Sequence, residues 1–128
     1  MKDNIQYLLN FPTPIISDSL DVLGINGGLE GIISLVPGQR IAGQAFTLEF
    51  EEVKEGQSGP AAEFIDEVDK GKIIVIANHS RSFCTVWGGI LTYVEQQKGI
   101  SGCIIDGACR DIDEIKAASF PMFVVQHI

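Results

Sequence analysis

Two short apolar runs with a glycine-bounded helix between them constrain the fold of this chain most strongly. Residues 73–77 read Ile-Ile-Val-Ile-Ala, and residues 103–105 read Cys-Ile-Ile. Continuous apolar runs of this length are typical of strands that are buried on both faces of a parallel sheet. Between them, Gly88 and Gly89 open a helical pattern that ends at Gly99, because glycine commonly follows the last turn of a helix. A strand, a helix and a strand in this order predict an α/β fold with a partly parallel sheet.

The rest of the chain continues the alternation of helices and strands. We expect further helices over residues 4–10, 13–23, 61–68 and 111–118, and further strands over residues 40–50 and 122–125. Thr13 is expected to cap its helix, because Pro14 suits the first helical position. At 128 residues, residues 1–128 are expected to form a single domain, large enough to bury a core without disulfides.

Charge and cysteine content narrow the classes of function. The net charge is −8, from 17 acidic and 9 basic residues, which argues against a direct nucleic-acid binder, since such proteins displace counterions with Lys and Arg. The apolar fraction of 45% hints at subunit contacts, although a well-filled core would also explain it. Three cysteines without metal-finger spacing fit a reducing cytoplasm. No signal peptide or membrane-spanning run is evident, so we expect a cytoplasmic protein with no membrane contact.

We expect the candidate functional groups to lie together in one crevice. The strand at residues 103–105 is expected to end at Asp106-Gly107, which would place the turn with Arg110 and Asp111 at its carboxyl end, where ligands gather in open α/β sheets. The first N–H groups of a helix have no internal partners and attract anions. The helix entrance that would supply such groups comprises Gly88, Gly89, Ile90 and Leu91.

Each candidate also has a structural interpretation. The guanidinium of Arg110 matches a carboxylate or an enolate oxygen, or it forms an ion pair with Asp106 or Asp111 that braces the turn. Asp111 is a carboxylate that could hold a hard cation, or it caps the next helix in a capping-box-like arrangement with Glu114. The glycine pair either exposes backbone amides to a ligand or allows close packing of helix and strand.

The remaining reactive side chains are expected to be structural. His79 and His127 stand alone and are interpreted as surface or loop residues. Cys103 lies within an apolar run and is interpreted as a core residue. Cys109 precedes Arg110, and the alternative interpretation for this residue is a thiol whose pKa the neighbouring positive charge lowers.

The same residues carry a family resemblance. Trp-Gly-x-x-Leu from Trp87 is followed by Gly-Ile-x-Gly-x-Ile-Ile-Asp-Gly-x-x-Arg-Asp and then by Phe-Pro-x-Phe from Phe120. Upstream, Thr-Pro-Ile-Ile-Ser-Asp-Ser-Leu and Ile-Ala-Gly-Gln-Ala-Phe-Thr extend the pattern to about residue 12. This arrangement resembles the RraA-like family, which is named for a regulator of ribonuclease activity and includes class II 4-hydroxy-4-methyl-2-oxoglutarate aldolases.

The resemblance implies a fold, an assembly and a chemistry. The fold would be the layered, swivelling β/β/α domain of phosphohistidine-domain type, assembled as a homotrimer or hexamer. The substrate would be a small 2-oxo acid such as oxaloacetate or pyruvate, bound by the amides of residues 88–91 and by Arg110. Arg110 would act in catalysis by stabilising a pyruvate enolate, and Asp111 would hold Mg²⁺ or Mn²⁺. The activity would be that of an aldolase or oxaloacetate decarboxylase.

Two departures from the family pattern favour an alternative. Aldolase members commonly carry an acidic residue directly after the Trp-Gly pair, where this chain has Gly89. Family chains also continue through further β structure after the Phe-Pro-x-Phe strand, so we expect the domain to lack that C-terminal region. The alternative function is a non-catalytic regulator that acts through contact with a ribonuclease or helicase partner.

Overall fold

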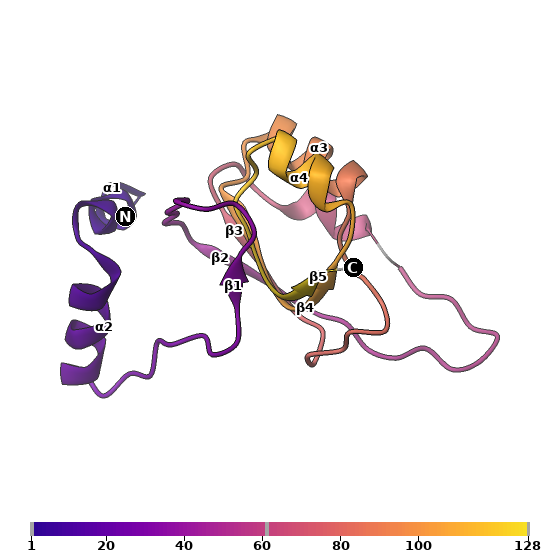
Figure 1. Ribbon diagram of the computed structural model, residues 1–128, viewed down its shortest axis with the longest axis horizontal. Coiled ribbons are helices and arrows are strands. Elements are labelled where there is room, and N and C mark those ends of the chain that lie inside the picture. The colour runs from indigo at the N-terminus through magenta and orange to yellow at the C-terminus, as the bar shows by residue number, and fades with distance from the viewer. Residues whose placement is uncertain (1, 61, 128) are drawn as a thin grey trace.

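The computed structural model describes residues 2–60 and 62–127, and a single sheet of five strands forms the centre of this part of the chain (Figure 1). The strand order is β1-β5-β4-β3-β2. The strands are β1 (Ile33–Ser34), β2 (Ala45–Glu49), β3 (Ile73–Ala77), β4 (Gly102–Cys109) and β5 (Met122–His127). Neighbours from β2 to β5 pair in parallel, and β1 pairs antiparallel with β5. The expectation of an α/β fold with a partly parallel sheet is confirmed.

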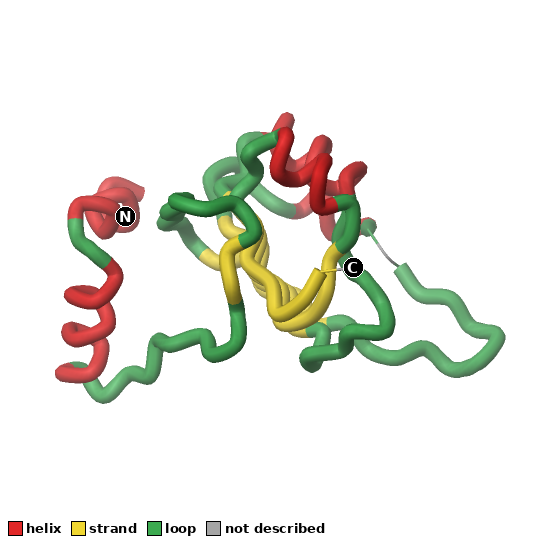
Figure 2. Tube along the Cα trace, viewed as in Figure 1, coloured by secondary structure: helices red, strands yellow, loops and turns green. Residues whose placement is uncertain are grey.

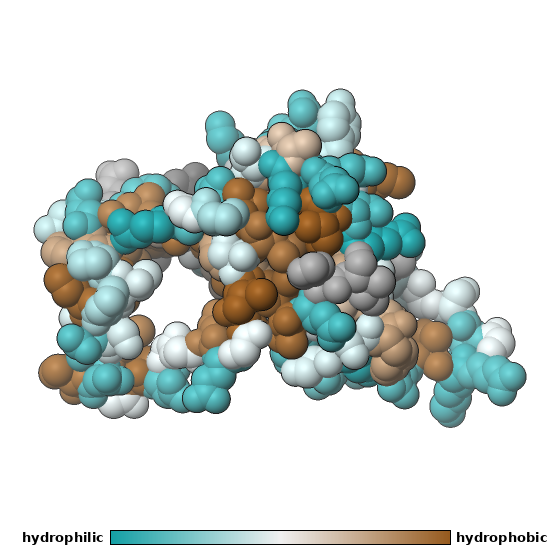
Figure 3. Space-filling model, viewed as in Figure 1, coloured by the Kyte–Doolittle hydropathy of each residue, from teal (hydrophilic) through white to brown (hydrophobic). Residues whose placement is uncertain are grey.

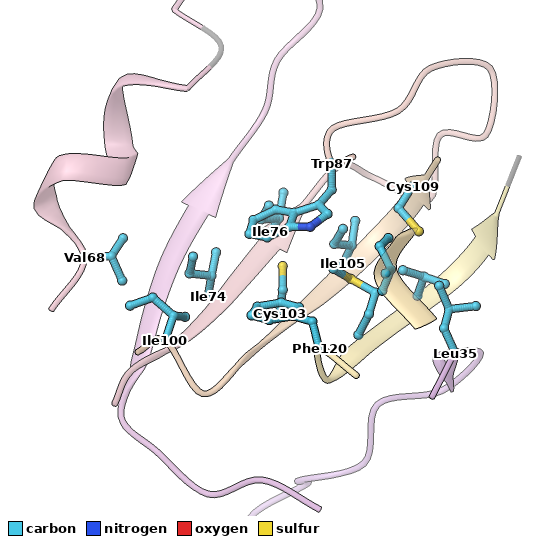
Figure 4. Close-up of a cluster of buried hydrophobic side chains, with 13 residues drawn as sticks. Leu35, Val68, Ile74, Ile76, Trp87, Ile100, Cys103, Ile105, Cys109 and Phe120 are labelled. Carbon is cyan, nitrogen blue, oxygen red and sulfur yellow. The ribbon is translucent and has the colours of Figure 1, made fainter. Parts of the chain in front are cut away.

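The helices that follow the central strands cover one face of this sheet. They are α3 (Gly89–Lys98), α4 (Ile112–Ala117) and the short 3₁₀ helix η2 (Glu63–Glu67). Figure 2 shows α3 and α4 on the same side of the strands. Figure 4 shows core side chains of β3 and β4 pointing toward that side, where the Trp87 indole stacks on Phe120 with ring centroids 6.0 Å apart. Each fully buried Ile or Phe stabilises the fold by about 1.5–3 kcal/mol. The fully buried residues that β3, β4 and β5 contribute include Ile74, Ile76, Cys103, Ile105, Met122 and Val124.

The boundaries of several elements differ from expectation. β2 is shorter than the strand expected over residues 40–50. η2 replaces the helix expected over residues 61–68, whose first residue lies outside the described part. β4 continues past Asp106-Gly107 to Cys109, so the expectation that the strand ends at that dipeptide was wrong. Pairing with other strands extends β4, because it lies between two parallel partners, β3 and β5. A register shift between Ile105 and Ala108 accommodates Asp106 and Gly107.

The N-terminal arm stands apart from this core. It comprises α1 (Lys2–Tyr7), η1 (Leu8–Asn10) and α2 (Thr13–Val22), and α2 contains no buried residue. Figure 3 shows an open gap between the arm and the body of the molecule. Among the described residues, two side-chain hydrogen bonds join the arm to the body: Gln6 donates to the Ala42 carbonyl (3.1 Å), and Arg40 donates to the Phe11 carbonyl. Thr13 is the first helical residue rather than the N-cap, since Pro12 takes that position without a side-chain cap.

No helix in residues 2–60 or 62–127 is both long enough and apolar enough to cross a membrane.

Candidate functional site

The entrance of α3 is fixed to the core by two hydrogen bonds. Gly88 has an extended backbone and precedes the helix without a side-chain cap. The Thr92 hydroxyl donates to the Gly88 carbonyl at 3.0 Å, and the Trp87 indole N–H donates to the same hydroxyl at 2.9 Å. Trp87 and Thr92 are each 2% exposed. The buried indole therefore holds the backbone at which the helix begins.

The segment that leads into α3 runs beside the end of β4. Thr85 forms a parallel bridge with Ala108, and the Val86 N–H donates to the Ala108 carbonyl at 3.3 Å. The Arg110 N–H donates to the Trp87 carbonyl at 3.1 Å. This pairing brings Arg110 and the residue after it directly to the entrance of α3.

Asp111 contacts α3 rather than its own helix. Its Oδ2 atom accepts the Gly89 N–H at 2.8 Å. Asp111 occupies the N-cap position of α4, but its side chain forms no capping bond there, so the capping-box interpretation with Glu114 was wrong. A capping residue usually has extended backbone angles, whereas Asp111 has a left-handed backbone with φ 61° and ψ 46°. The carboxylate thus satisfies one of the unpaired amides of α3 and leaves the start of α4 uncapped.

Arg110 lies beside this carboxylate with most of its side chain in solvent. Its Nε is 3.6 Å from Asp111 Oδ2, and the side chain is 67% exposed. Asp106, the other expected partner, accepts a hydrogen bond from the Ser80 hydroxyl at 2.6 Å instead. An exposed ion pair of this kind contributes little to stability, so the guanidinium is available to an anionic ligand.

The two glycines allow these groups to approach the backbone closely. A Cβ added to Gly88 would lie 2.7 Å from Asp111 Oδ2 and 3.4 Å from Arg110 Nε. A Cβ added to Gly89 would overlap the carboxylate of Glu114, whose Cδ is 2.8 Å from that position. Glu114 was not among the candidates from sequence, because its spacing from Asp111 matched a capping box.

A cleft of about 330 Å³ collects the expected site residues. Its wall includes all the residues predicted from sequence as substrate or metal ligands, and it also includes residues that the sequence did not indicate. The lining residues are Phe50, Ala62, Thr85, Val86, Trp87, Gly88, Gly89, Ile90, Leu91, Arg110 and Asp111. The structure therefore brings Gly88–Leu91, Arg110 and Asp111 together, while their roles in substrate or metal binding stay predictions.

None of the other reactive side chains that the structure describes lines the cleft. Burial raises the pKa of the Cys109 thiol to about 11, and the nearby Asp111 carboxylate adds to the effect, so a lowered pKa is wrong for this residue. Cys103 is fully buried in the core. His79 is a surface residue whose Nε2 lies 3.8 Å from Glu49 Oε2, and the side chain of His127 lies outside the described residues.

The protein is therefore an α/β protein with a mostly parallel sheet, helices on one face of it and a cleft at the entrance of α3. The chain belongs to the RraA-like family, because the family model described as "RraA-like: Aldolase/RraA" matches residues 13–128.

Two similar proteins match nearly the whole of this chain. Protein DlpA of Legionella pneumophila is 39% identical over 96% of this chain and 20% of its own length. A protein of Halalkalibacterium halodurans named "Putative 4-hydroxy-4-methyl-2-oxoglutarate aldolase" is 32% identical over 94% of this chain and 55% of its own length. The chain thus spans about half of the second relative and a fifth of the first.

A solved structure supports the fold. Streptomyces coelicolor RraAS2, described as an unusual member of the RNase ES inhibitor RraA protein family, superimposes with a TM-score of 0.89 and 25% identity. The match covers 97% of this chain and 63% of that one.

Proposed function

We propose that this chain is a metal-dependent lyase acting on small 2-oxo acids, as an aldolase or oxaloacetate decarboxylase that proceeds through a pyruvate enolate. One observation carries the proposal: an exposed guanidinium, the bare backbone of a helix entrance and a carboxylate share one cleft of about 330 Å³. A cleft of this volume is within the size range of small-molecule sites. The family name and the aldolase name of the Halalkalibacterium relative support the same chemistry.

The residues at the α3 entrance fit a small hard cation. Residues 2–60 and 62–127 contain no group of three or more His, Cys, Asp or Glu side chains placed to hold a metal ion. Mg²⁺ and similar cations, however, often keep several waters and use only one or two protein carboxylates together with the substrate. The carboxylate of Asp111 accepts the Gly89 N–H, and both residues line the cleft. Asp111 would hold Mg²⁺ or Mn²⁺, and such a cation supplies Lewis-acid polarisation of a keto oxygen.

The chain's own groups account for binding and charge stabilisation. A substrate carboxylate fits the guanidinium of Arg110, which remains charged at any working pH. When the bond between C3 and C4 of oxaloacetate breaks, C4 leaves as CO₂. The electron pair of the broken bond stays with C3 and moves into the pyruvate enolate. The negative charge then grows on oxygen, where Arg110 and the amides of Ile90 and Leu91 stabilise it. A proton from water at C3 completes pyruvate.

The test is pyruvate release from oxaloacetate, measured with lactate dehydrogenase and NADH. We expect Mg²⁺-dependent turnover above the rate with heat-denatured protein, and EDTA should abolish it. Arg110→Ala should lower kcat about 100-fold, as loss of an oxyanion-stabilising donor does elsewhere. Lys116→Ala is the matched control, because it removes one exposed positive charge from α4 outside the cleft lining. Turnover that persists in Arg110→Ala, or that never exceeds background, would contradict the proposal.

A second candidate is a regulator that acts by protein contact. The net charge of −8 and the absence of a side chain at Gly89 favour it, and RraAS2 is described as belonging to a family of RNase ES inhibitors. A pull-down against purified ribonuclease and helicase partners, repeated from low to high salt, tests this candidate. Absence of salt-sensitive binding would remove its support. The expected trimeric or hexameric assembly likewise stays a prediction, which sedimentation velocity can check.

A further inference from the structure

A second hollow adjoins the cleft across Phe50 and Ala62. Its volume is about 590 Å³, and these two residues belong to the linings of both hollows. Phe50 follows the last residue of β2, and its N–H donates to the Ala77 carbonyl of β3 at 2.9 Å. Arg110 follows β4, which is separated from β2 by β3. Neighbouring strands are about 4.8 Å apart, so the cleft reaches across about 10 Å from Arg110 to Phe50.

Hydrogen bonds fix the backbone of Phe50 on both sides. Besides the bond from its N–H, its carbonyl accepts from Arg81 Nη2 at 2.6 Å, and Arg81 Nε donates to Asn78 Oδ1 at 3.1 Å. Asn78 is 2% exposed, and the side chain of Arg81 is 15% exposed. The Phe50 side chain itself is partly buried against the hydrophobic core. A wall held in this way resists displacement by a ligand, which is a requirement for a residue that selects ligands by size.

The second hollow is strongly acidic, and we call it the acidic hollow. The charged side chains of its lining are those of Glu49, Glu51, Glu52, Glu63, Glu67 and Lys54. Arg81 offsets one of the negative charges, since its Nη1 lies 3.7 Å from Glu52. The Glu63 carboxylate lies at the boundary with the cleft, because its Oε2 accepts the Ala62 N–H at 3.3 Å. A surface lined by charges of one sign repels a ligand group of the same sign, so the acidic hollow disfavours a carboxylate.

We propose that Phe50 and the acidic hollow determine which acids the cleft accepts, namely short 2-oxo acids whose carboxylates all remain on the Arg110 side of Phe50. Phe50 limits the length of the acid. The glutamates beyond Phe50 exclude a carboxylate at the far end of a longer acid, because that group would be left without a positive partner. This inference rests on the proposed function, since it defines the substrate class of the same cleft.

Calorimetric titration of the full chain in Mg²⁺ with three 2-oxo acids tests length without any assay of turnover. 2-Oxobutyrate is short, whereas 2-oxohexanoate and 2-oxoadipate have the same greater length and differ in the distal carboxylate. The wild type should bind 2-oxobutyrate most tightly and 2-oxoadipate most weakly. Phe50→Ala should strengthen the binding of both long acids on the order of tenfold and leave 2-oxobutyrate nearly unchanged. Phe83→Ala is the matched control with wild-type selectivity, because Phe83 is an exposed phenylalanine outside both linings.

Two glutamate variants test charge separately from length. Glu63→Gln keeps the shape of the side chain and removes the carboxylate charge at the boundary. It should strengthen the binding of 2-oxoadipate on the order of threefold without changing that of 2-oxohexanoate, and the gain should shrink as the salt concentration rises. Glu30→Gln removes the same charge from an exposed residue outside both linings, so it should change neither affinity.

Circular dichroism verifies the fold of each variant, and Phe50→Leu repeats the length test with a smaller loss of core packing. Wild-type affinity for 2-oxohexanoate in both Phe50 variants, or the same gain in Phe83→Ala, overturns the role of Phe50. Wild-type affinity for 2-oxoadipate in Glu63→Gln, or the same gain in Glu30→Gln, overturns the exclusion by charge. In these cases the wild type still binds 2-oxobutyrate, so the proposed function stands. A wild type that binds none of the three acids overturns the proposed function and this inference together.

Discussion

Replacing Thr92 by valine tests how the entrance of α3 is held in place. Valine keeps the shape of threonine but lacks the hydroxyl that accepts from the Trp87 indole at 2.9 Å and donates to the Gly88 carbonyl at 3.0 Å. Both side chains are 2% exposed, so water has little access to the indole N–H that loses its partner. The Gly88 carbonyl retains a second donor, the Thr92 N–H at 3.1 Å. The main loss is therefore one unsatisfied buried donor, which costs about 1–3 kcal/mol.

Urea unfolding followed by tryptophan fluorescence measures this loss, because Trp87 is the one tryptophan of the chain. We expect a lower midpoint with an unchanged slope, as for a change in stability without a change in the surface exposed on unfolding. Thr92→Ser keeps the hydroxyl and should recover most of the difference, while Tyr93→Phe changes an exposed neighbour on the same helix and should have no effect. A loss below about 0.5 kcal/mol, which is typical of surface substitutions, would refute the reasoning.

Two further predictions concern buried ionisable groups. Burial raises the pKa of Glu95, a fully buried residue with both side-chain oxygens unpaired among the described groups, against an opposing effect of Lys98. The Glu95 carboxyl then ionises at a lower pH in the unfolded state than in the native state, so the free energy of unfolding should fall as pH rises from about 4.5 through the native pKa. Glu95→Gln should remove this fall, and parallel pH curves for variant and wild type would contradict the prediction. Ellman's reagent at pH 8 should react rapidly with Cys84 and not with Cys109, whose buried thiol has a pKa of about 11; Cys84→Ser should therefore show no fast phase, and a persisting fast phase would show that a core thiol is accessible.

Local signals in the sequence predicted the central elements well. The five apolar residues of β3 lie where the run at residues 73–77 indicated, and α3 ends at Gly99. Gly99 has the left-handed conformation that glycine adopts most easily. These elements follow from short-range patterns that no distant contact overrides. Asp106-Gly107 was misleading for the opposite reason: it resembles a turn, but pairing with two neighbouring strands extends β4 through it.

Local sequence patterns were also insufficient to predict the contacts within the candidate site. The sequence placed Arg110 and Asp111 beside the helix entrance, because the ends of parallel strands share one edge of the sheet. It could not indicate the direction of the Asp111 carboxylate, since the spacing to Glu114 fits a capping box as well as it fits the observed contacts. The deciding partner is the amide of Gly89, which lies 22 residues away along the chain.

Backbone hydrogen bonds join Val86 to Ala108 and Trp87 to Arg110. They close residues 86–110 into a loop of fixed length. Residues added in the segment 51–60 lie outside this loop and leave its dimensions alone. A single residue added within α3 turns every later residue of that helix by about 100°, which would misalign either its buried face or the start of β4. The number of residues in the segment 51–60 can therefore change without moving the cleft residues. The number of residues between Trp87 and Arg110 cannot change in this way.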